Sequence, residues 1–173
     1  MLRIRHRYML RERETKKMFK KLMKKYPKIY GAIVNKKSRI EHIVTDDETE
    51  IEIIDKKPIL IKFKGEVTIP TINILNEVSD EIPKVIVDQG AIPYIINGAD
   101  IMRPGIVNIE GKFDKGAIVQ IQEERFHKTI AIGMALYTWN EILEKKKGKV
   151  VKNIHHVGDK LWDLIKKATT SNE

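Results

Sequence analysis

Carboxylates in close succession are the first residues of this sequence that could do chemistry. The acids between positions 46 and 52 are Asp46, Asp47, Glu48, Glu50 and Glu52. Paired carboxylates serve in general acid–base catalysis or hold magnesium. Here, however, the last two alternate with Thr49, Ile51 and Ile53, as the solvent-facing side chains of a β-strand do. We therefore interpret this cluster as an exposed strand face and not as a site.

Histidine, cysteine and serine offer no recognisable metal or nucleophile motif. His155 and His156 are adjacent, and neighbouring strand residues point to opposite faces, so they cannot easily share one metal. His6, His42 and His127 lack ligand spacing such as an i, i+4 pair. The sequence has no cysteine, which excludes disulfides, thiolate zinc sites and a thiol nucleophile. Phosphate-loop and Gly-x-Ser-x-Gly motifs are also missing, and we predict a protein without a catalytic centre, metal or cofactor.

A glycine-marked loop at residues 97–105 leaves two interpretations open. Gly98 and Gly105 permit positive φ and close approach of the backbone to a ligand, and runs of exposed amides suit phosphate oxygens. Arg103 would add a fork-shaped donor for a phosphate or a base edge. On spacing alone, however, an ordinary tight loop with turn glycines explains the same residues.

The positive charge of the chain is concentrated at its N-terminal end. The 173 residues carry 33 Lys and Arg against 24 Asp and Glu, a formal charge of +9. Residues 1–40 alone hold 15 of the basic residues and 2 of the acids. Such a block attracts polyanions, although a solvated basic face would have the same composition. We predict an auxiliary basic surface formed by Arg3, Arg5, Arg7, Lys17, Lys20, Lys21 and Lys24.

The apolar stretches are too short for a membrane protein. None approaches the ~18–20 residues that span a bilayer, and no apolar signal-peptide core follows the basic N-terminus. No bulky aromatic anchors accompany the clustered charge. We therefore predict a cytoplasmic protein whose polyanionic partner is nucleic acid and not a membrane.

The hydrophobic periodicity predicts two small α+β domains. Residues 2–8 alternate as a strand would, and the apolar stripe that follows predicts an amphipathic helix with its N-cap at Thr15 and a stop at Pro27. Short β-branched runs come next, up to a polar segment at 79–83 that ends in proline and marks the best domain boundary. The second half has many short strands with glycine turns, which indicates a small β-barrel.

Three motifs in the second half resemble a known RNA-binding module. They are VDQGAI at 87–92, NGADIMRPG at 97–105 and NIHHVGDKLW at 153–162. This series is similar to the PUA domain of the malignant-T-cell-amplified-sequence family, which is shared with ligatin. Asp100 and His156 depart from the family pattern, which often has Asn and Tyr there. The segments PILIKF at 58–63 and IPTINIL at 69–75 are similar to that family's pre-PUA domain, so the likeness extends over nearly the whole chain.

The resemblance implies an α+β pre-PUA domain over residues 1–82, a PUA β-pseudobarrel over 83–167 and a frayed tail at 168–173. It also implies RNA binding without catalysis, at the first short helix of the barrel, the glycine loop and the later motif. The residues at these positions are Gly90, Ala91, Asn97, Gly98, Ala99, Met102, Arg103, Pro104, Gly105, His155, His156 and Lys160.

The partners that the resemblance implies are tRNA or rRNA, the small ribosomal subunit and a protein with an SUI-type domain. Related eukaryotic proteins act there in initiation and recycling, and the composition fits an archaeal relative. An accessory RNA-binding subunit or adaptor of an RNA-modification or protein complex is the alternative. Because aromatic residues make up only 6% of the chain, we expect recognition of RNA shape and backbone to dominate.

Overall fold

The computed structural model describes residues 1–65 and 67–170, which divide into two compact units. Unit 1 comprises Met1–Glu81 together with the chain from Leu164 onward, and unit 2 comprises Ile82–Asp163. Each unit has its own sheet. The fold is therefore α+β. No helix among the described residues has both the length and the apolar character that a membrane crossing requires.

Unit 1 is built on a five-stranded antiparallel sheet whose strands pair in chain order. The strands are β1 (Ile4–Met9), β2 (Ile40–Thr45), β3 (Glu50–Ile54), β4 (Lys57–Lys62) and β5 (Thr68–Pro70). The helices are α1 (Glu12–Lys25), α2 (Pro27–Ile33) and α3 (Ile72–Glu77), with the C-terminal part of α6 (Lys160–Thr170).

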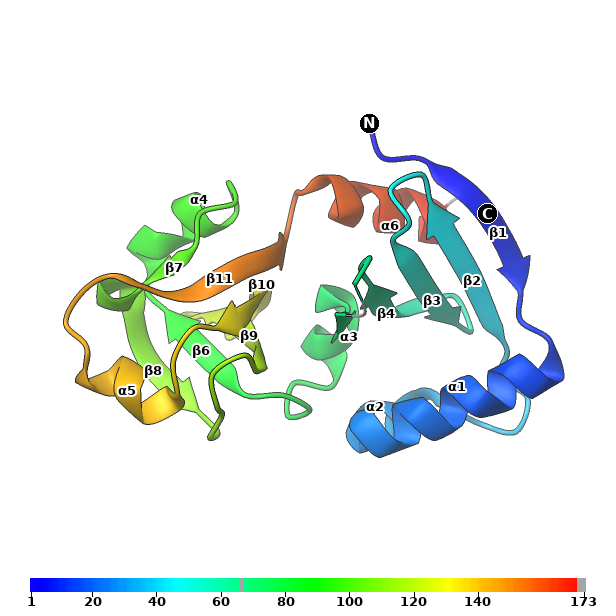
Figure 1. Ribbon diagram of the computed structural model, residues 1–173, viewed down its shortest axis with the longest axis horizontal. Helices are drawn as coiled ribbons and strands as arrows, with labels where there is room; N and C mark the ends of the chain where they lie inside the picture. Colours follow the sequence, from blue (N-terminus) through cyan, green and yellow to red (C-terminus); the bar gives the residue numbers. More distant parts are fainter. Residues whose placement is uncertain (66, 171–173) are drawn as a thin grey trace. The chain divides into compact units, whose positions relative to one another are not determined.

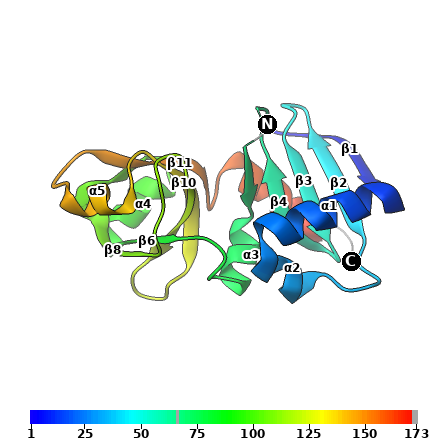
Figure 2. The ribbon, with the colours of Figure 1, turned by 60° about the horizontal axis from the view of Figure 1, so that its bottom comes forward.

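Helix α1 and the C-terminal part of α6 lie on opposite faces of this sheet (Figures 1 and 2). Two neighbouring residues of β1 mark the two faces, because successive strand residues point in opposite directions. Arg7 donates a hydrogen bond to the carbonyl oxygen of Ala168 in α6, whereas the ring of Tyr8 contacts the ring of His42 on the other face. Both faces of the sheet are therefore covered, and isoleucines such as Ile43 and Ile51 are fully buried.

The start of α1 differs from the sequence prediction, whereas its end agrees with it. The helix begins at Glu12, where the side chain of Glu14 accepts a hydrogen bond from the Arg11 backbone at 3.0 Å, so Thr15 is not its N-cap. The helix ends at Lys25, just before Pro27 as predicted, and Pro27 then opens α2 as its first residue. Proline is favoured at that position because its missing N–H would have no partner within the helix.

The predicted frayed tail is also wrong for the part that the structure describes. Ala168 to Thr170 form the last turn of α6, and Ala168 is only 4% exposed. The apolar stripe of the helix continues to this residue and packs in unit 1, which stabilises the last turn. Residues 171–173 of the predicted tail lie outside the described part of the chain.

Unit 2 contains a curled six-stranded sheet in the order β7-β11-β10-β9-β6-β8, as the prediction of a small barrel requires. The strands are β6 (Lys84–Val87), β7 (Ile101–Met102), β8 (Ile106–Glu110), β9 (Ile118–Glu123), β10 (Thr129–Ala135) and β11 (Lys149–His156). Only β6 and β9 pair in parallel among the described strand pairs. The short helices are η1 (Gln89–Ala91), α4 (Ile92–Ile95), η2 (Arg103–Gly105) and α5 (Trp139–Glu144).

The core of unit 2 fixes the position of the segment that follows β6. Val85 and Val87 on β6 pack with Ile121, Ala131 and Val151 in one buried cluster. Ile95 at the end of α4 and Ile101 in β7 belong to the same cluster. Ile95 and Ile101 therefore anchor the glycine loop to the barrel on both sides, while residues 96–99 between them are exposed.

Candidate nucleic-acid interface

The segment between β6 and β8 encloses a hollow of about 420 Å³ on the surface of unit 2. Six of the residues predicted to bind RNA line it, and they are Gly90, Ala91, Ala99, Met102, Pro104 and Gly105. Asp88, Tyr94, Ile95, Asp100 and Ile101 complete its lining. The fold thus brings the first short helix and the glycine loop together around one concave site.

Two backbone contacts give the hollow its shape. Asp88 caps η1 by accepting a hydrogen bond from the Ala91 amide at 2.9 Å, which is the usual task of an aspartate before a helical turn. Its own amide donates to the carbonyl oxygen of Gly105, also at 2.9 Å. At Gly105 a Cβ atom would come within 3.1 Å of the Ala91 Cβ, so the close approach of these two segments requires a glycine or a shift of Ala91.

The backbone amides of the glycine loop are engaged within the protein. The amides of Asn97, Gly98 and Ala99 donate to carbonyl oxygens of Tyr94 and Ile95 at 3.0–3.2 Å. These bonds satisfy the carbonyl groups at the C-terminal end of α4, which need partners outside the helix. Gly98 adopts a φ of +95°, as the end of a helix favours. The three amides are therefore not free donors for phosphate, and the tight-loop interpretation describes this part of the loop.

Asn153 on β11 holds the loop from the side. Its side-chain amide donates to the carbonyl oxygens of Ile95 at 3.0 Å and Ala99 at 2.9 Å. Its backbone amide donates to Asp100 at 2.8 Å, and Asp100 also forms an ion pair with Lys149 at 2.7 Å. Burial raises the pKa of Asp100, but its bonds to Lys149 and Asn153 outweigh this effect and leave the pKa below its ordinary value. The sequence motif contained Asn153 without revealing this role.

In this structure Arg103 bonds to the backbone of the protein and so helps to hold the loop in place. Its guanidinium donates to the carbonyl oxygen of Ile106 at 3.1 Å and to that of Leu143 at 3.5 Å, and Arg103 does not line the hollow. These contacts join the loop to the end of α5. The predicted role as a phosphate donor stays a prediction, and the structure adds a positioning role that the sequence did not indicate.

The histidines of the later motif differ sharply in exposure. His155 is 1% exposed and its Nδ1 lies 2.7 Å from a carboxylate oxygen of Asp159, so the prediction that His155 contacts RNA is wrong. His155 faces the interior of the protein, as its 1% exposure shows. His156 is half-buried with its Nε2 about 3.5 Å from the position of a Cβ on Gly98, which places it beside the loop. Lys160 is exposed.

Tyr94 is an exposed lining residue that was not among the residues predicted to bind RNA. It is 71% exposed and lines the hollow beside Met102, which is 49% exposed. The spacing contained a signal, because Ile92 and Ile95 lie three positions apart on the face of α4 that meets the core, and Tyr94 falls on the opposite face. An exposed aromatic ring beside a hollow is a platform on which a base can stack.

The predicted basic surface of unit 1 is present but smaller than expected. Arg3, Arg5 and the lysines of α1 are exposed, and the lysines concerned are Lys17, Lys20, Lys21 and Lys24. Arg7 is different, because its guanidinium contacts the Glu41 carboxylate at 2.6 and 3.2 Å. Its charge is neutralised within the sheet, so the prediction that Arg7 belongs to a free basic surface is wrong.

The interpretation of the acidic cluster also needs correction. Glu52 does not face solvent but is 5% exposed, while Glu50 is half-buried. The alternation with Ile51 and Ile53 does hold, since both isoleucines are buried. Helix α1, however, covers the opposite face of β3 as well (Figure 2), and a strand covered on both faces buries its polar residues too.

Comparison with known proteins assigns a PUA domain to unit 2 and finds relatives that match both units. The family model described as "PUA domain" matches residues 83–157. The uncharacterised protein MJ1432 of Methanocaldococcus jannaschii is 40% identical over 163 residues, which cover 94% of this chain and 99% of that protein. Translation machinery-associated protein 20 of Saccharomyces cerevisiae is 35% identical over 153 residues, covering 83% and 84% of the two chains.

Two solved structures are similar to this chain over both of its units. A hypothetical protein from Pyrococcus horikoshii is 34% identical with a TM-score of 0.78, covering 92% of this chain and 99% of that one. A PUA-domain protein from Aeropyrum pernix, solved as a tartrate complex, is 25% identical with a TM-score of 0.79, covering 98% and 95%.

Proposed function

Because the chain belongs to the PUA-domain family that includes Translation machinery-associated protein 20 and malignant T-cell-amplified sequence, we propose that it is a non-enzymatic RNA-binding protein of translation. The RNA is tRNA or rRNA, contacted on the small ribosomal subunit during initiation or recycling. The names of its relatives and the PUA domain support a role in translation with RNA as the ligand. The finer assignment to these RNAs and to this subunit is our proposal.

The observation that carries this proposal is the hollow with Tyr94 at its edge. A single-stranded segment of RNA can place one base against the Tyr94 ring, since stacking accepts any base. The adjoining sugar and backbone then contact the apolar wall formed by Ala91, Met102 and Pro104. Because the loop amides are already paired, we expect shape and stacking to contribute more here than amide–phosphate bonds.

Positive charge for the phosphates is available next to the hollow and on unit 1. Lys149 pairs with Asp100 in the lining, and its side chain remains 54% exposed. Lys152 is exposed and close enough to lower the pKa of Asp100 further. The lysines of α1 supply a second basic surface without sequence preference, because phosphate contacts position an RNA but do not read its bases.

A binding experiment with paired aromatic variants tests this proposal. Unfractionated tRNA, intact or lacking its 3′ terminal nucleotides, is titrated with the full chain at low and at moderate salt. Tyr94→Ala is expected to weaken binding by about 5- to 100-fold, since stacking of one base contributes ~1–3 kcal/mol. Phe126→Ala is the matched control, because Phe126 is equally exposed at 70% but lies outside the hollow.

Two outcomes would contradict the proposal. If the full chain shows no RNA binding even at low salt, the function itself is wrong. If RNA binds but both variants weaken binding equally, the hollow is not the binding site. Loss of binding on removal of the 3′ nucleotides would identify the end of tRNA as the ligand, and unchanged binding would favour rRNA or another part of tRNA.

The proposal includes a protein partner with an SUI-type domain. A pull-down from a cell extract with the tagged full chain, repeated after nuclease treatment, separates a protein contact from an RNA tether. We expect such a partner to remain bound after nuclease treatment. Recovery of RNA-modification enzymes instead would favour the adaptor role that the sequence left open.

A further inference from the structure

The face of the unit 1 sheet that meets α1 carries a row of polar groups where a core would be apolar. Strand pairing sets Tyr8 opposite His42 and His42 opposite Glu52, and the row ends where Glu52 meets Leu60. Glu50 lies two residues before Glu52 on β3 and therefore shares this face. Neither RNA-binding surface uses these polar side chains, and the acid–histidine pair is not explained by packing.

The carboxylate of Glu52 is buried, and one of its two oxygens lacks a hydrogen-bond partner among the described residues. His42 is 8% exposed and Glu52 is 5% exposed. The Oε1 atom of Glu52 lies 2.8 Å from the Nδ1 of His42, whereas its Oε2 atom has no hydrogen-bond partner among the described residues. A buried carboxylate oxygen without a partner is costly, so a ligand that supplies the missing interaction would be stabilised there.

The second ring nitrogen of His42 also faces a group with which it forms no hydrogen bond. Its Nε2 lies 3.8 Å from the Oε2 of Glu50, which is longer than a hydrogen bond. If Nδ1 donates to Glu52, the neutral ring presents a lone pair at Nε2 to a carboxylate oxygen, and two acceptors then face each other. Donor atoms bound to one metal at bond lengths of about 2.0–2.2 Å lie ~3–4 Å apart, so the gap is of the size that a bridging cation fills.

We propose that His42, Glu50 and Glu52 bind a divalent transition-metal ion of the zinc class. Each side chain offers one ligand atom, and the three atoms lie within 4.8 Å of one another. One imidazole and two carboxylates suit zinc better than magnesium or calcium, which prefer oxygen ligands alone.

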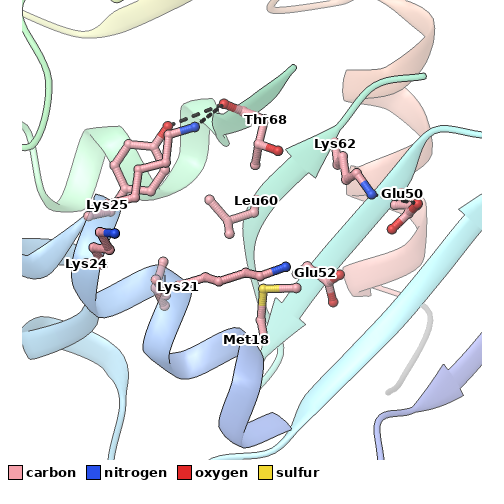
Figure 3. Close-up of a pocket in the computed structure, with 11 residues that line it drawn as sticks. Met18, Lys21, Lys24, Lys25, Glu50, Glu52, Leu60, Lys62 and Thr68 are labelled. Carbon is pink, nitrogen blue, oxygen red and sulfur yellow. Dashed lines mark hydrogen bonds and ion pairs between the residues drawn. The ribbon is translucent and has the colours of Figure 1, made fainter. Parts of the chain in front are cut away.

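An open cavity beside the cluster gives such an ion access to solvent. The cavity measures about 700 Å³ and is lined by residues of α1 and of the sheet, with Glu50, Glu52 and Lys62 on one side and Met18 and Lys21 on the other. Figure 3 shows both glutamates directed into this space. Three protein ligands with an open position toward solvent leave room for a water as the fourth ligand.

Two lysines near the site should lower its affinity for a cation, and replacing one of them tests whether the bound ion is positive. Lys62 lies 3.4 Å from the Oε1 of Glu50, which leaves the Oε2 atom of that carboxylate facing His42. The Lys21 side chain extends into the cavity toward Glu52 (Figure 3). Positive charge at these positions opposes a bound cation, so removing the charge of Lys62 is expected to tighten binding several-fold.

Calorimetric titration of the full chain with zinc chloride alone, in the absence of RNA, tests the proposal. One ion per chain is expected to bind. Both Glu52→Gln and His42→Gln are expected to weaken zinc binding by at least about tenfold. Removing a residue that only supports a metal ligand already lowers metal affinity by about that factor. The control is His6→Gln, because His6 is an exposed histidine on β1 and its loss should leave binding unchanged.

Folding of each variant is checked by circular dichroism and thermal melting. Lys62→Gln keeps the test decisive if the buried variants do not fold, because Lys62 is exposed and its loss should strengthen binding. The proposal is overturned if the unaltered chain binds no zinc. It is also overturned if His6→Gln weakens binding as much as His42→Gln, or if Lys62→Gln does not tighten it.

Discussion

The side-chain amide of Asn153 donates to the carbonyl oxygen of Ala99 at 2.9 Å, across 54 positions of sequence. This bond joins β11 to the glycine loop, and a second bond from the same amide reaches Ile95. One side chain therefore sets the position of the loop relative to the barrel. The residues that line the hollow depend on this contact, although Asn153 itself is outside the lining.

Replacement of Asn153 should loosen the loop. Asn153→Ala leaves the carbonyl oxygens of Ile95 and Ala99 without these donors, and we expect the free energy of unfolding to fall by ~1–3 kcal/mol. RNA affinity should fall as well. Urea unfolding and tRNA titration of the same variant measure both effects. Unchanged stability and unchanged affinity together would show that the two hydrogen bonds of the Asn153 side chain do not position the loop.

Replacement of Arg103 should act mainly on stability. Arg103→Ala removes the donors to Ile106 and Leu143, which we expect to cost ~1–2 kcal/mol in urea unfolding. The control is Arg125→Ala, because Arg125 is exposed and its guanidinium contacts only the Phe126 ring among the side-chain contacts described for it. If Arg103→Ala leaves stability unchanged but abolishes RNA binding, the direct phosphate role predicted from the sequence is the better account.

The pairing of His155 with Asp159 predicts a dependence of stability on pH. Burial raises the pKa of Asp159, but the bonds from His155 and from the amides of Trp162 and His156 outweigh it and lower the pKa. The stabilisation is therefore present above the unfolded pKa of about 3.9 and is lost as the pH falls through the lowered folded value.

Asp159→Asn isolates this contribution from other carboxylates. The variant should be less stable than the unaltered chain by ~1–3 kcal/mol near neutral pH, because a hydrogen-bonded charge is removed. The difference should shrink when urea unfolding is repeated at a pH below the unfolded pKa of about 3.9, because protonation of the unfolded chain there removes part of the stabilisation. A difference that stays constant between the two pH values would show that the charge of Asp159 is not responsible.

The lysines of α1 should control the salt dependence of RNA binding. Replacing Lys17, Lys20 and Lys24 together by glutamine should reduce the slope of log affinity against log salt by ~0.7–0.9 for each lysine that contacts a phosphate. The control replaces three exposed lysines of unit 2, namely Lys115, Lys146 and Lys147, with the same change in charge. Equal slopes for the two variants would show that net charge, and not this surface, sets the dependence.

Local patterns in the sequence predicted most elements of the fold. Alternation of residue types indicated β1 and β3, whereas the resemblance to the PUA domain indicated Gly90, Ala91 and Gly105, which line one hollow. These features depend on neighbouring residues, and backbone preferences act over the same short range. The charge asymmetry was likewise visible in the sequence, because charges on a long solvated helix stay exposed after folding.

Only the tertiary structure decided which side chains are accessible and which meet. Periodicity shows that Glu50 and Glu52 share a face, but not that α1 covers it or that strand register brings His42 to Glu52. In the same way, the motif at 153–162 contains Asn153 and His155, but it does not show that His155 is buried or that Asn153 bonds to a loop far away in sequence. Burial and cross-strand contacts depend on segments far apart in sequence, so the packing of the whole chain determines them.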